Sequence, residues 1–236
     1  MLPAIETRDL VKSFGNTKVL CGLNIKVKAG ATLAILGPNG AGKTTLIKTM
    51  ASVMRPTSGQ VLIDGWSLEE RALEARGHIG LVSHQSYLYR TLSAEENLIF
   101  YGRMYGIAGL KERINEILIL VGLAPRRHDR VATFSRGMLQ RLSLGRALLH
   151  KPPIMMLDEP DTGLDPQALA TMWSILRQDA PNRTIVFTSH HFERALAAAS
   201  EVMMLAKGKI AWSTPSCELN LETIDEAYAR AAGEQR

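Results

Sequence analysis

The sequence predicts an α/β fold built on a mostly parallel β-sheet. A glycine-rich loop at residues 37–45 lies between a short apolar run, 31–36, and a run without helix breakers, 46–50. A second apolar run, 154–157, ends in two acidic residues and is followed by a helix-like pattern and another strand-like run, 184–188. A strand, a helix and a strand in this order form a βαβ unit, the building block of parallel sheets.

The glycine-rich loop has the pattern G-x-x-x-x-G-K-[ST] between a strand and a helix. Its residues are Gly37, Pro38, Asn39, Gly40, Ala41, Gly42, Lys43, Thr44 and Thr45. Glycines let successive backbone N–H groups surround phosphate oxygens, and the helix N-terminus favours the same anion. Lys43 would reach the terminal phosphates and the Thr44 hydroxyl would ligate Mg²⁺. A plain glycine-rich turn is the alternative, but the flanking strand and helix favour a site for a nucleoside triphosphate with Mg²⁺.

Composition limits the class of protein. The chain has 236 residues, of which 46% are hydrophobic and 22% charged, as is typical of a soluble globular domain. No run approaches the roughly 18 apolar residues that span a bilayer, and the N-terminus does not resemble a signal peptide. Cys21 and Cys217 are too few for a disulfide framework. We therefore expect a cytoplasmic protein, or one on the cytoplasmic side of a membrane.

The net charge of +5 does not by itself indicate nucleic-acid binding. The densest basic cluster, residues 126–130, is interrupted by Asp129 and has no interleaved aromatic residue. A solvated loop explains this cluster better than a nucleic-acid surface does.

The remaining elements follow from period and turn signals. Short strand patterns come first and are separated by turns such as 14–16 and 28–30; they cover residues 4–10, 23–27, 33–36, 60–63 and 80–83. From about 93 to 150 apolar residues recur at helical spacing, as in Leu98, Tyr101 and Tyr105. Strand patterns return at 154–157, 184–188, 202–205 and 209–211, with a helix pattern at 166–177 between the first two. A last helix is predicted at 223–232.

Two acidic residues at the end of the strand 154–157 point to the same sheet edge as the glycine-rich loop. Asp158 would hold Mg²⁺, directly or through a water, and Glu159 would polarise an attacking water. An acid pair at a strand end is common, and it becomes informative only together with the phosphate-binding loop.

Residues 134–138, with the letters FSRGM, and the following LQRL resemble the signature motif of ABC ATPases, the nucleotide-binding subunits of ABC transporters. Four further motifs occur in that family's order, and the resemblance covers essentially the whole chain. They are Phe14 for the adenine platform, Gln85 for the Q-loop, residues 163–165 for the D-loop and His190 for the switch histidine.

This resemblance implies the fold and its organisation. We expect a P-loop NTPase with a RecA-like core and an antiparallel β subdomain, plus an inserted α-helical signature subdomain. The chain would be a single ABC ATPase domain, residues 1–236. Its core would comprise 1–85 and 151–215, its helical subdomain 86–150 and its tail 216–236.

The resemblance also implies roles for the remaining motifs. The amides at Ser135 and Gly137, just before a helix, would form an anion site for the γ-phosphate held by another copy of the chain, and Arg136 adds a cation there. Gln85 would ligate Mg²⁺ or its water, although a polar loop residue is the alternative. His190 would contact the γ-phosphate and the attacking water; its spacing from Glu159 favours it over the neighbouring His191.

Three of the roles have a packing or capping alternative beside them. Phe14 would stack on adenine, with core packing as the alternative. Asp165 would act across the dimer interface, and it could also cap the helix that follows. Ser135 could likewise be a simple helix cap.

The signature departs from the usual Leu-Ser-Gly-Gly-Gln at three of five positions, Phe134, Arg136 and Met138. Ser135 and Gly137 are retained. Methionine cannot make the hydrogen bonds of glutamine, so polar support must come from another residue. Hydrolysis remains expected at an undetermined rate.

The family's mechanism implies two partners and no nucleic acid. A second copy would complete each site in a head-to-tail dimer around two ATP molecules. A membrane permease would dock near residues 87–105 and hold the chain peripherally on the cytoplasmic face of the inner membrane. ATP binding and hydrolysis would close and open the dimer to power export.

The most specific prediction concerns the branch of the ABC ATPase family to which the chain is similar. The stretches 82–89, 92–98 and 127–130 are similar to the haem-exporter ATPases of cytochrome c maturation, the CcmA branch. The alternative is the ATPase of an ABC-2 type exporter of drugs, lipids or polysaccharide. A soluble ABC ATPase of DNA repair or translation is the alternative of another class, and the lack of a coiled-coil insertion or a second ATPase domain disfavours it.

Overall fold

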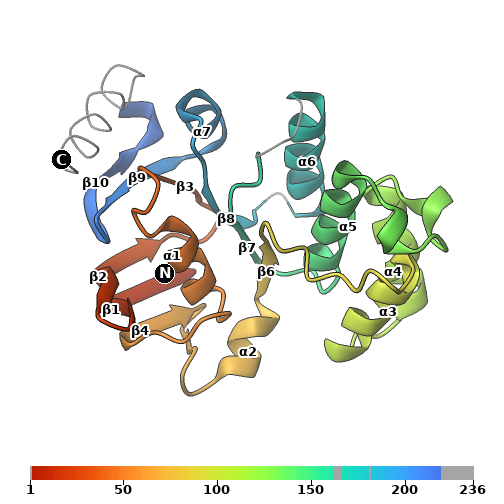
Figure 1. Ribbon diagram of the computed structural model, residues 1–236, viewed down its shortest axis with the longest axis horizontal. Coiled ribbons are helices and arrows are strands. Elements are labelled where there is room, and N and C mark those ends of the chain that lie inside the picture. The colour runs from red at the N-terminus through yellow and green to blue at the C-terminus, as the bar shows by residue number, and fades with distance from the viewer. Residues whose placement is uncertain (1, 162–165, 181, 219–236) are drawn as a thin grey trace.

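The computed structural model describes residues 2–161, 166–180 and 182–218, which form two β-sheets and a group of helices at one side (Figure 1). The expected P-loop NTPase fold, with its antiparallel subdomain and inserted helices, is confirmed. The predicted D-loop at 163–165 and tail helix at 223–232 lie outside the described residues.

The larger sheet has six strands in the order β10-β9-β3-β8-β7-β6. Their bounds are β3 Thr32–Leu36, β6 Ile79–Val82, β7 Ile154–Leu157, β8 Thr184–Thr188, β9 Glu201–Ala206 and β10 Lys209–Pro215. All neighbours pair in parallel except β9 and β10. Although β6 lies at the edge of the sheet, strands β6, β7 and β8 are all buried along their whole length, which explains their continuous apolar sequences.

The smaller sheet is antiparallel, in the order β2-β1-β4-β5. Its strands are β1 Ile5–Phe14, β2 Thr17–Val27, β4 Ser58–Ile63 and β5 Trp66–Ser67. The first two are longer than the predicted strands because they continue as a solvent-exposed hairpin that turns at Gly15 and Asn16. Asp9 has a φ of 46° where the register shifts, so a bulge interrupts the alternation that sequence reasoning follows.

The helices are α1 Lys43–Met50, α2 Ala72–Gly77, α3 Ala94–Met104, α4 Leu110–Leu120, α5 Arg136–Leu148, α6 Pro166–Asp179 and α7 Phe192–Ala198. Short 3-10 turns occur at Ala124–Arg126, Val131–Thr133 and Ser216–Glu218. Figure 1 shows α3, α4 and α5 together beside β6, on the side of the parallel sheet away from α1. Helices α2 and α7 were not predicted, because each is too short to show a helical period.

Strand β3 separates two hydrophobic cores. Ala34 and Leu36 belong to the core under α3, α4, α5 and α6, whereas Leu33 and Ile35 belong to the core shared with α1 and the antiparallel sheet. Successive strand residues point to opposite faces, so one short strand anchors both halves of the molecule. The loop that follows β3 therefore starts from a strand that is packed into both hydrophobic cores.

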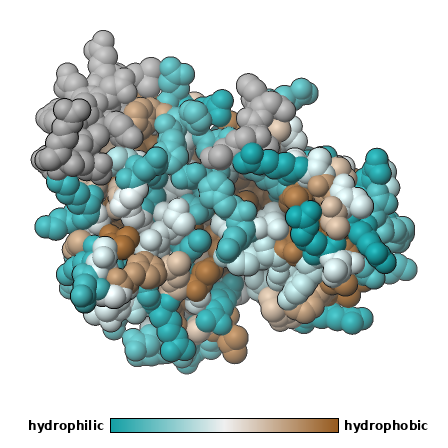
Figure 2. All heavy atoms as spheres, in the orientation of Figure 1, coloured by the Kyte–Doolittle hydropathy of each residue, from teal (hydrophilic) through white to brown (hydrophobic). Residues whose placement is uncertain are grey.

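Among the described residues, no helix has the length and hydropathy that crossing a bilayer requires. The face in Figure 2 is largely hydrophilic, with hydrophobic side chains in small separate patches.

Candidate functional site

The glycine-rich loop connects β3 to α1 and requires glycine at two positions. Gly37 has a φ of 147°, and a Cβ there would lie 2.1 Å from the Leu205 carbonyl oxygen. Gly42 has a φ of 105° and caps α1 without a side chain. The first turn of α1 carries no acidic residue, so its N–H groups and positive end face the loop. This geometry suits an anion.

Lys43, the first residue of α1, is buried inside the loop. Its Nζ donates to the carbonyl oxygens of Gly37 at 2.7 Å and Pro38 at 3.1 Å. Burial lowers the pKa of Lys43, while the nearby Glu159 and Asp158 carboxylates partly offset this effect. The ammonium group is thus held where the loop closes around a ligand.

Asp158, at the end of β7, contacts both sides of the site. Its Oδ1 accepts from the Thr44 hydroxyl at 3.0 Å and from the Thr188 hydroxyl, at the end of β8, at 3.2 Å. The Asp158 side chain is buried, yet Oδ2 has no hydrogen-bond partner among the described residues. A buried carboxylate oxygen without a partner is costly unless a cation or donor binds it.

A magnesium ion fits this donor set. Carboxylate and hydroxyl oxygens are hard ligands, and Mg²⁺ is usually bound by one or two protein groups, substrate phosphates and waters. Within the described part of the chain, no three histidine, cysteine or acidic side chains gather into a complete metal cage. Asp158 and Thr44 match the smaller protein contribution that Mg²⁺ needs.

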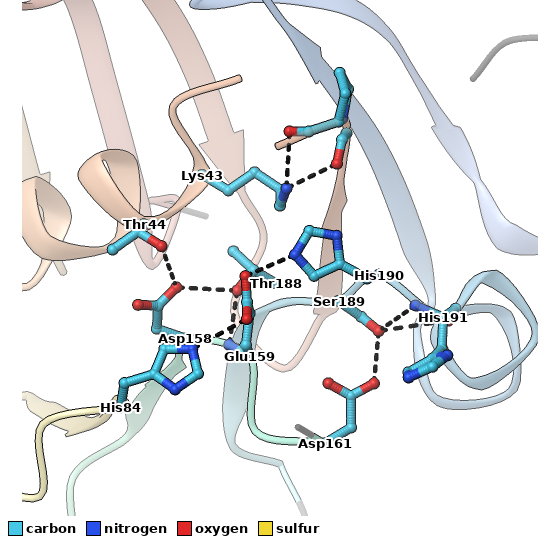
Figure 3. Close-up of polar contacts among 12 residues, drawn as sticks. Lys43, Thr44, His84, Asp158, Glu159, Asp161, Thr188, Ser189, His190 and His191 are labelled. Atoms are coloured by element: carbon cyan, nitrogen blue, oxygen red, sulfur yellow. Dashed lines mark hydrogen bonds and ion pairs between the residues drawn. The ribbon is translucent and has the colours of Figure 1, made fainter. Parts of the chain in front are cut away.

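Two histidines are hydrogen-bonded to the carboxylate of Glu159, as Figure 3 shows. Its Oε1 lies 2.7 Å from Nε2 of His190, and its Oε2 lies 3.0 Å from Nε2 of His84. Burial opposes ionisation of Glu159, but hydrogen bonds and charge from His190 and His84 outweigh it and lower the pKa of the carboxyl group.

The backbone of Glu159 is strained, with a φ of 51°. Its N–H donates to the Thr188 hydroxyl at 2.8 Å, which also donates to Asp158. Strain of this kind persists where surrounding contacts fix it, and it gathers at functional sites. The acid pair is therefore held rigidly at the carboxyl edge of the sheet.

Sequence reasoning missed part of this network. His84 lies beside the predicted Gln85, yet it is His84 that contacts Glu159. Thr188 joins the two acids, although a threonine at the end of a strand gives no signal in a single sequence. Ser189, the next residue, donates to Asp161 at 2.7 Å and accepts from the His191 N–H.

The position of His190 beside Glu159 agrees with the choice of His190 over His191. His191 is instead the N-cap residue of α7. Gln85 lies in the exposed loop after β6, where its carbonyl accepts from the Ser83 hydroxyl. No described hydrogen bond joins the Gln85 side chain to Thr44 or Asp158, so its place in the predicted metal set stays a prediction.

The signature residues lie at the start of α5. Ser135 is the N-cap residue, and its hydroxyl accepts from the Met138 N–H at 3.3 Å. The sequence placed Gly137 before the helix, but α5 begins at Arg136, so Gly137 belongs to the first turn. Ser135, Arg136 and Gly137 are all exposed, which leaves the turn accessible to another molecule.

Polar support near the signature comes from Gln140, one turn into α5. Its Nε2 donates to the Pro160 carbonyl at 2.7 Å, which ties α5 to the residue after the acid pair. Arg136 and Glu159 also line a common hollow of about 290 Å³. The methionine at position 138 is thus accompanied by a nearby amide that supplies a hydrogen bond.

The predicted adenine platform, Phe14, stands at the tip of the β1–β2 hairpin. It is 48% exposed, so the alternative of core packing is wrong. Lys12 Nζ lies 5.0 Å from the centre of the Phe14 ring. Asp165 lies outside the described residues.

A family model described as ABC transporter matches residues 20–162. The chain belongs to the ABC transporter family. It is an ATP-binding subunit of that family, and therefore an ATPase. This membership confirms the resemblance to ABC ATPases that the five sequence motifs indicated.

Three curated relatives of this ABC subunit are named for resistance, transport or export. It is 34% identical to the linearmycin resistance ATP-binding protein LnrL of Bacillus subtilis, over 95% of this chain and 77% of that protein. It is 38% identical to the bacitracin transport ATP-binding protein BcrA of Bacillus licheniformis, over 91% and 71%. It is 36% identical to the Nod factor export ATP-binding protein I of Burkholderia lata, over 92% and 73%.

Solved structures share the fold of this ABC subunit. An ATP-binding subunit of an ABC transporter superposes with a TM-score of 0.87 at 27% identity, covering 97% of this chain and 99% of that one. The dimeric bacterial ABC transporter cassette MJ0796 superposes with a TM-score of 0.82 at 25% identity, covering 90% and 98%. The haem-exporter branch finds no support in these comparisons, whose relatives carry drug, antibiotic and Nod factor names.

Proposed function

We propose that this chain powers an ABC-2 type exporter of a drug, lipid or polysaccharide. The support is the set of relatives, which are named for linearmycin resistance, bacitracin transport and Nod factor export. These names favour the alternative over the haem exporter of cytochrome c biogenesis. The chain would act peripherally, on the cytoplasmic face of the inner membrane, bound to its permease.

ATP hydrolysis would take place at the sheet edge where Lys43, Thr44, Asp158, Glu159 and His190 converge. That convergence is the observation that carries the mechanism (Figure 3).

The glycine-rich loop and Lys43 would hold the phosphates, and Phe14 would stack on adenine. Thr44 and Asp158 would hold Mg²⁺, with Gln85 brought in by movement of its loop; the ion would neutralise charge on the β- and γ-phosphates.

Glu159 would accept the proton of the attacking water as its oxygen bonds to the γ-phosphorus. The bond from that phosphorus to the bridging oxygen breaks, which leaves ADP and phosphate. His190, hydrogen-bonded to Glu159, would orient the water and contact the γ-phosphate.

A second copy of the chain would complete each site. Ser135, Arg136 and Gly137 are exposed on α5, separated from the phosphate loop by strands β8, β7 and β6 in the sheet order. Neighbouring strands lie about 4.8 Å apart, so this turn is displaced by roughly 14 Å along the sheet. The turn is therefore too far away to contact the ATP bound by its own chain, but in a head-to-tail dimer it would contact the phosphates of the ATP bound by the other copy. The similar cassette MJ0796 is described as a dimer. Asp165 is assigned to the same interface.

Replacing Glu159 by Gln tests the reaction. The amide cannot accept the proton, so we expect turnover to fall by about 10² or more while ATP still binds, since base catalysis contributes about 10²–10⁴-fold. The ATP-bound dimer should then accumulate in size-exclusion chromatography. Lys43→Ala, which loses the phosphate contact, is the matched control that should form no such dimer. Undiminished turnover in Glu159→Gln would refute the assignment of the base.

The cargo class is tested through the permease. We expect the full chain, expressed in its native cell and captured from solubilised membranes, to carry an ABC-2 exporter permease, identified by mass spectrometry. Capture of a cytochrome c maturation membrane subunit instead would restore the haem-exporter alternative.

The predicted docking segment includes α3, which exposes the side chains of Phe100 and Met104. Phe100→Glu should therefore weaken the capture of the permease.

A further inference from the structure

His84 contacts the carboxylate of Glu159 on the side opposite His190. The two imidazoles engage different oxygens, Oε2 at 3.0 Å and Oε1 at 2.7 Å. Only 19% of the Glu159 side chain is exposed, and its N–H is fixed by Thr188. Both carboxylate oxygens are thus engaged before any substrate water can approach.

His84 lies just after β6, in a loop whose later part, at Tyr87 and Tyr89, is hydrogen-bonded to α3. Asn97 of α3 accepts from the Tyr89 N–H at 2.8 Å and donates to the Tyr89 carbonyl at 3.0 Å. The Tyr101 hydroxyl, also on α3, donates to the Tyr87 carbonyl. These contacts link α3 to the later part of the loop that carries His84.

The loop is also under strain and anchored on the far side. Tyr87 has a φ of 54°, which is unfavourable for a residue with a side chain. The buried guanidinium of Arg146 lies 5.5 Å from the Tyr87 ring and 5.2 Å from the Tyr101 ring. A segment held in a strained conformation by such contacts suits a shift between discrete arrangements.

We propose that His84 is a positioning residue that restrains Glu159 until movement of α3 withdraws it. With His84 in place, Oε2 is occupied by the imidazole and Glu159 is held away from a productive contact with water. A shift of the loop that swings His84 away as it brings Gln85 in frees Oε2, while His190 keeps Oε1 oriented. This inference rests on the proposed role of Glu159 as the base, and it adds a control that links the helical region to the chemistry.

The test compares steady-state ATP hydrolysis by the purified full chain and its variants. His84→Leu removes the donor at similar size, so we expect basal kcat to rise about tenfold, the factor that corresponds to about 1.4 kcal/mol. KM for ATP should stay unchanged, because the restraint acts on Glu159 and not on the phosphate loop. His84→Gln, whose amide N–H can still donate, should raise kcat much less.

Controls separate this effect from a general change in structure. His128→Leu alters an exposed histidine that pairs with Glu95, and it should leave kcat unchanged. Thermal unfolding of each variant reports any loss of folding. Unchanged or reduced kcat in folded His84→Leu, or an equal rise in His84→Gln, would overturn the restraint.

Glu159→Gln, measured in parallel, distinguishes the two proposals. If Glu159→Gln is inactive and His84→Leu shows no rise, only the restraint fails. If Glu159→Gln still turns over, the proposed base fails and the restraint falls with it. The double variant with His84→Leu and Glu159→Gln should be as inactive as Glu159→Gln alone. Removing the restraint on a glutamine side chain does not create a base.

Discussion

Thr188 is the residue on which the acid pair depends most. Its hydroxyl accepts from the Glu159 N–H at 2.8 Å and donates to Asp158 at 3.2 Å, and its side chain is fully buried. It holds Glu159 in a positive-φ conformation while orienting the carboxylate of Asp158. One small side chain thereby sets the geometry of two proposed catalytic groups.

Thr188→Val keeps the shape but removes both hydrogen bonds. The part-buried N–H of Glu159 loses its acceptor, and Asp158 Oδ1 keeps only the hydrogen bond from Thr44, which together cost about 1–3 kcal/mol of the free energy of unfolding. Urea unfolding should show this loss together with reduced kcat. Thr171→Val, on the exposed face of α6, is the control and should change stability by less than about 0.5 kcal/mol. Equal effects of the two variants would contradict the role of Thr188.

At the scale of elements, the half-buried His150 lies at the junction of α3, α5 and β6. His150, two residues after α5, stacks on Tyr105 at the end of α3, with ring centres 3.9 Å apart. Its Nε2 lies 3.0 Å from the Ile79 carbonyl oxygen, which can only accept, so Nε2 carries the proton. Burial lowers the pKa of His150 to about 4, with the charges of nearby arginines adding to the effect and the Ile79 hydrogen bond opposing it.

This lowered pKa predicts a loss of stability in mild acid. The histidine of the unfolded chain, with a pKa near 6.5, takes up a proton before the folded one does, so the free energy of unfolding falls as the pH drops from about 6.5 to 4. The full shift corresponds to about 3 kcal/mol at 1.36 kcal/mol per unit. His150→Gln keeps a donor for Ile79 and should remove this part of the pH dependence. Urea unfolding measured between pH 7 and 4 checks it; parallel curves for the two proteins would contradict it.

At the scale of the whole molecule, the parallel and the antiparallel sheet meet beside the loop after β3, where Gly37 faces Leu205 of β9 and Gly42 faces Val19 of β2. The site lies at the carboxyl ends of three adjacent parallel strands, β3, β8 and β7, which supply the loop with Lys43, then Thr188 and His190, then the acid pair. Residues more than a hundred positions apart, such as Thr44 and Asp158, come within 3.0 Å because parallel strands end at one edge. The loop after β6 touches this edge through His84, and α5 touches it through Gln140.

Much of this arrangement could be predicted from the sequence. The glycine-rich loop and the acid pair follow local rules, since a loop that surrounds phosphate needs glycine at fixed positions and a buried strand needs continuous apolar residues. Strand ends and short helices could not be predicted as well. The β1–β2 hairpin extends through polar residues, and α2 and α7 are shorter than two helical turns, so neither shows a readable period.

The sequence by itself determined the fold, the ATP-binding loop and the family, because these depend on residue types at fixed spacing along the chain. Only the tertiary structure decided which side chains meet at Glu159. It placed His84 rather than Gln85 against the carboxylate and joined the two acids through Thr188. These contacts are made between strands and loops far apart in the chain, and their geometry depends on sheet order, strain and burial, none of which a local pattern records.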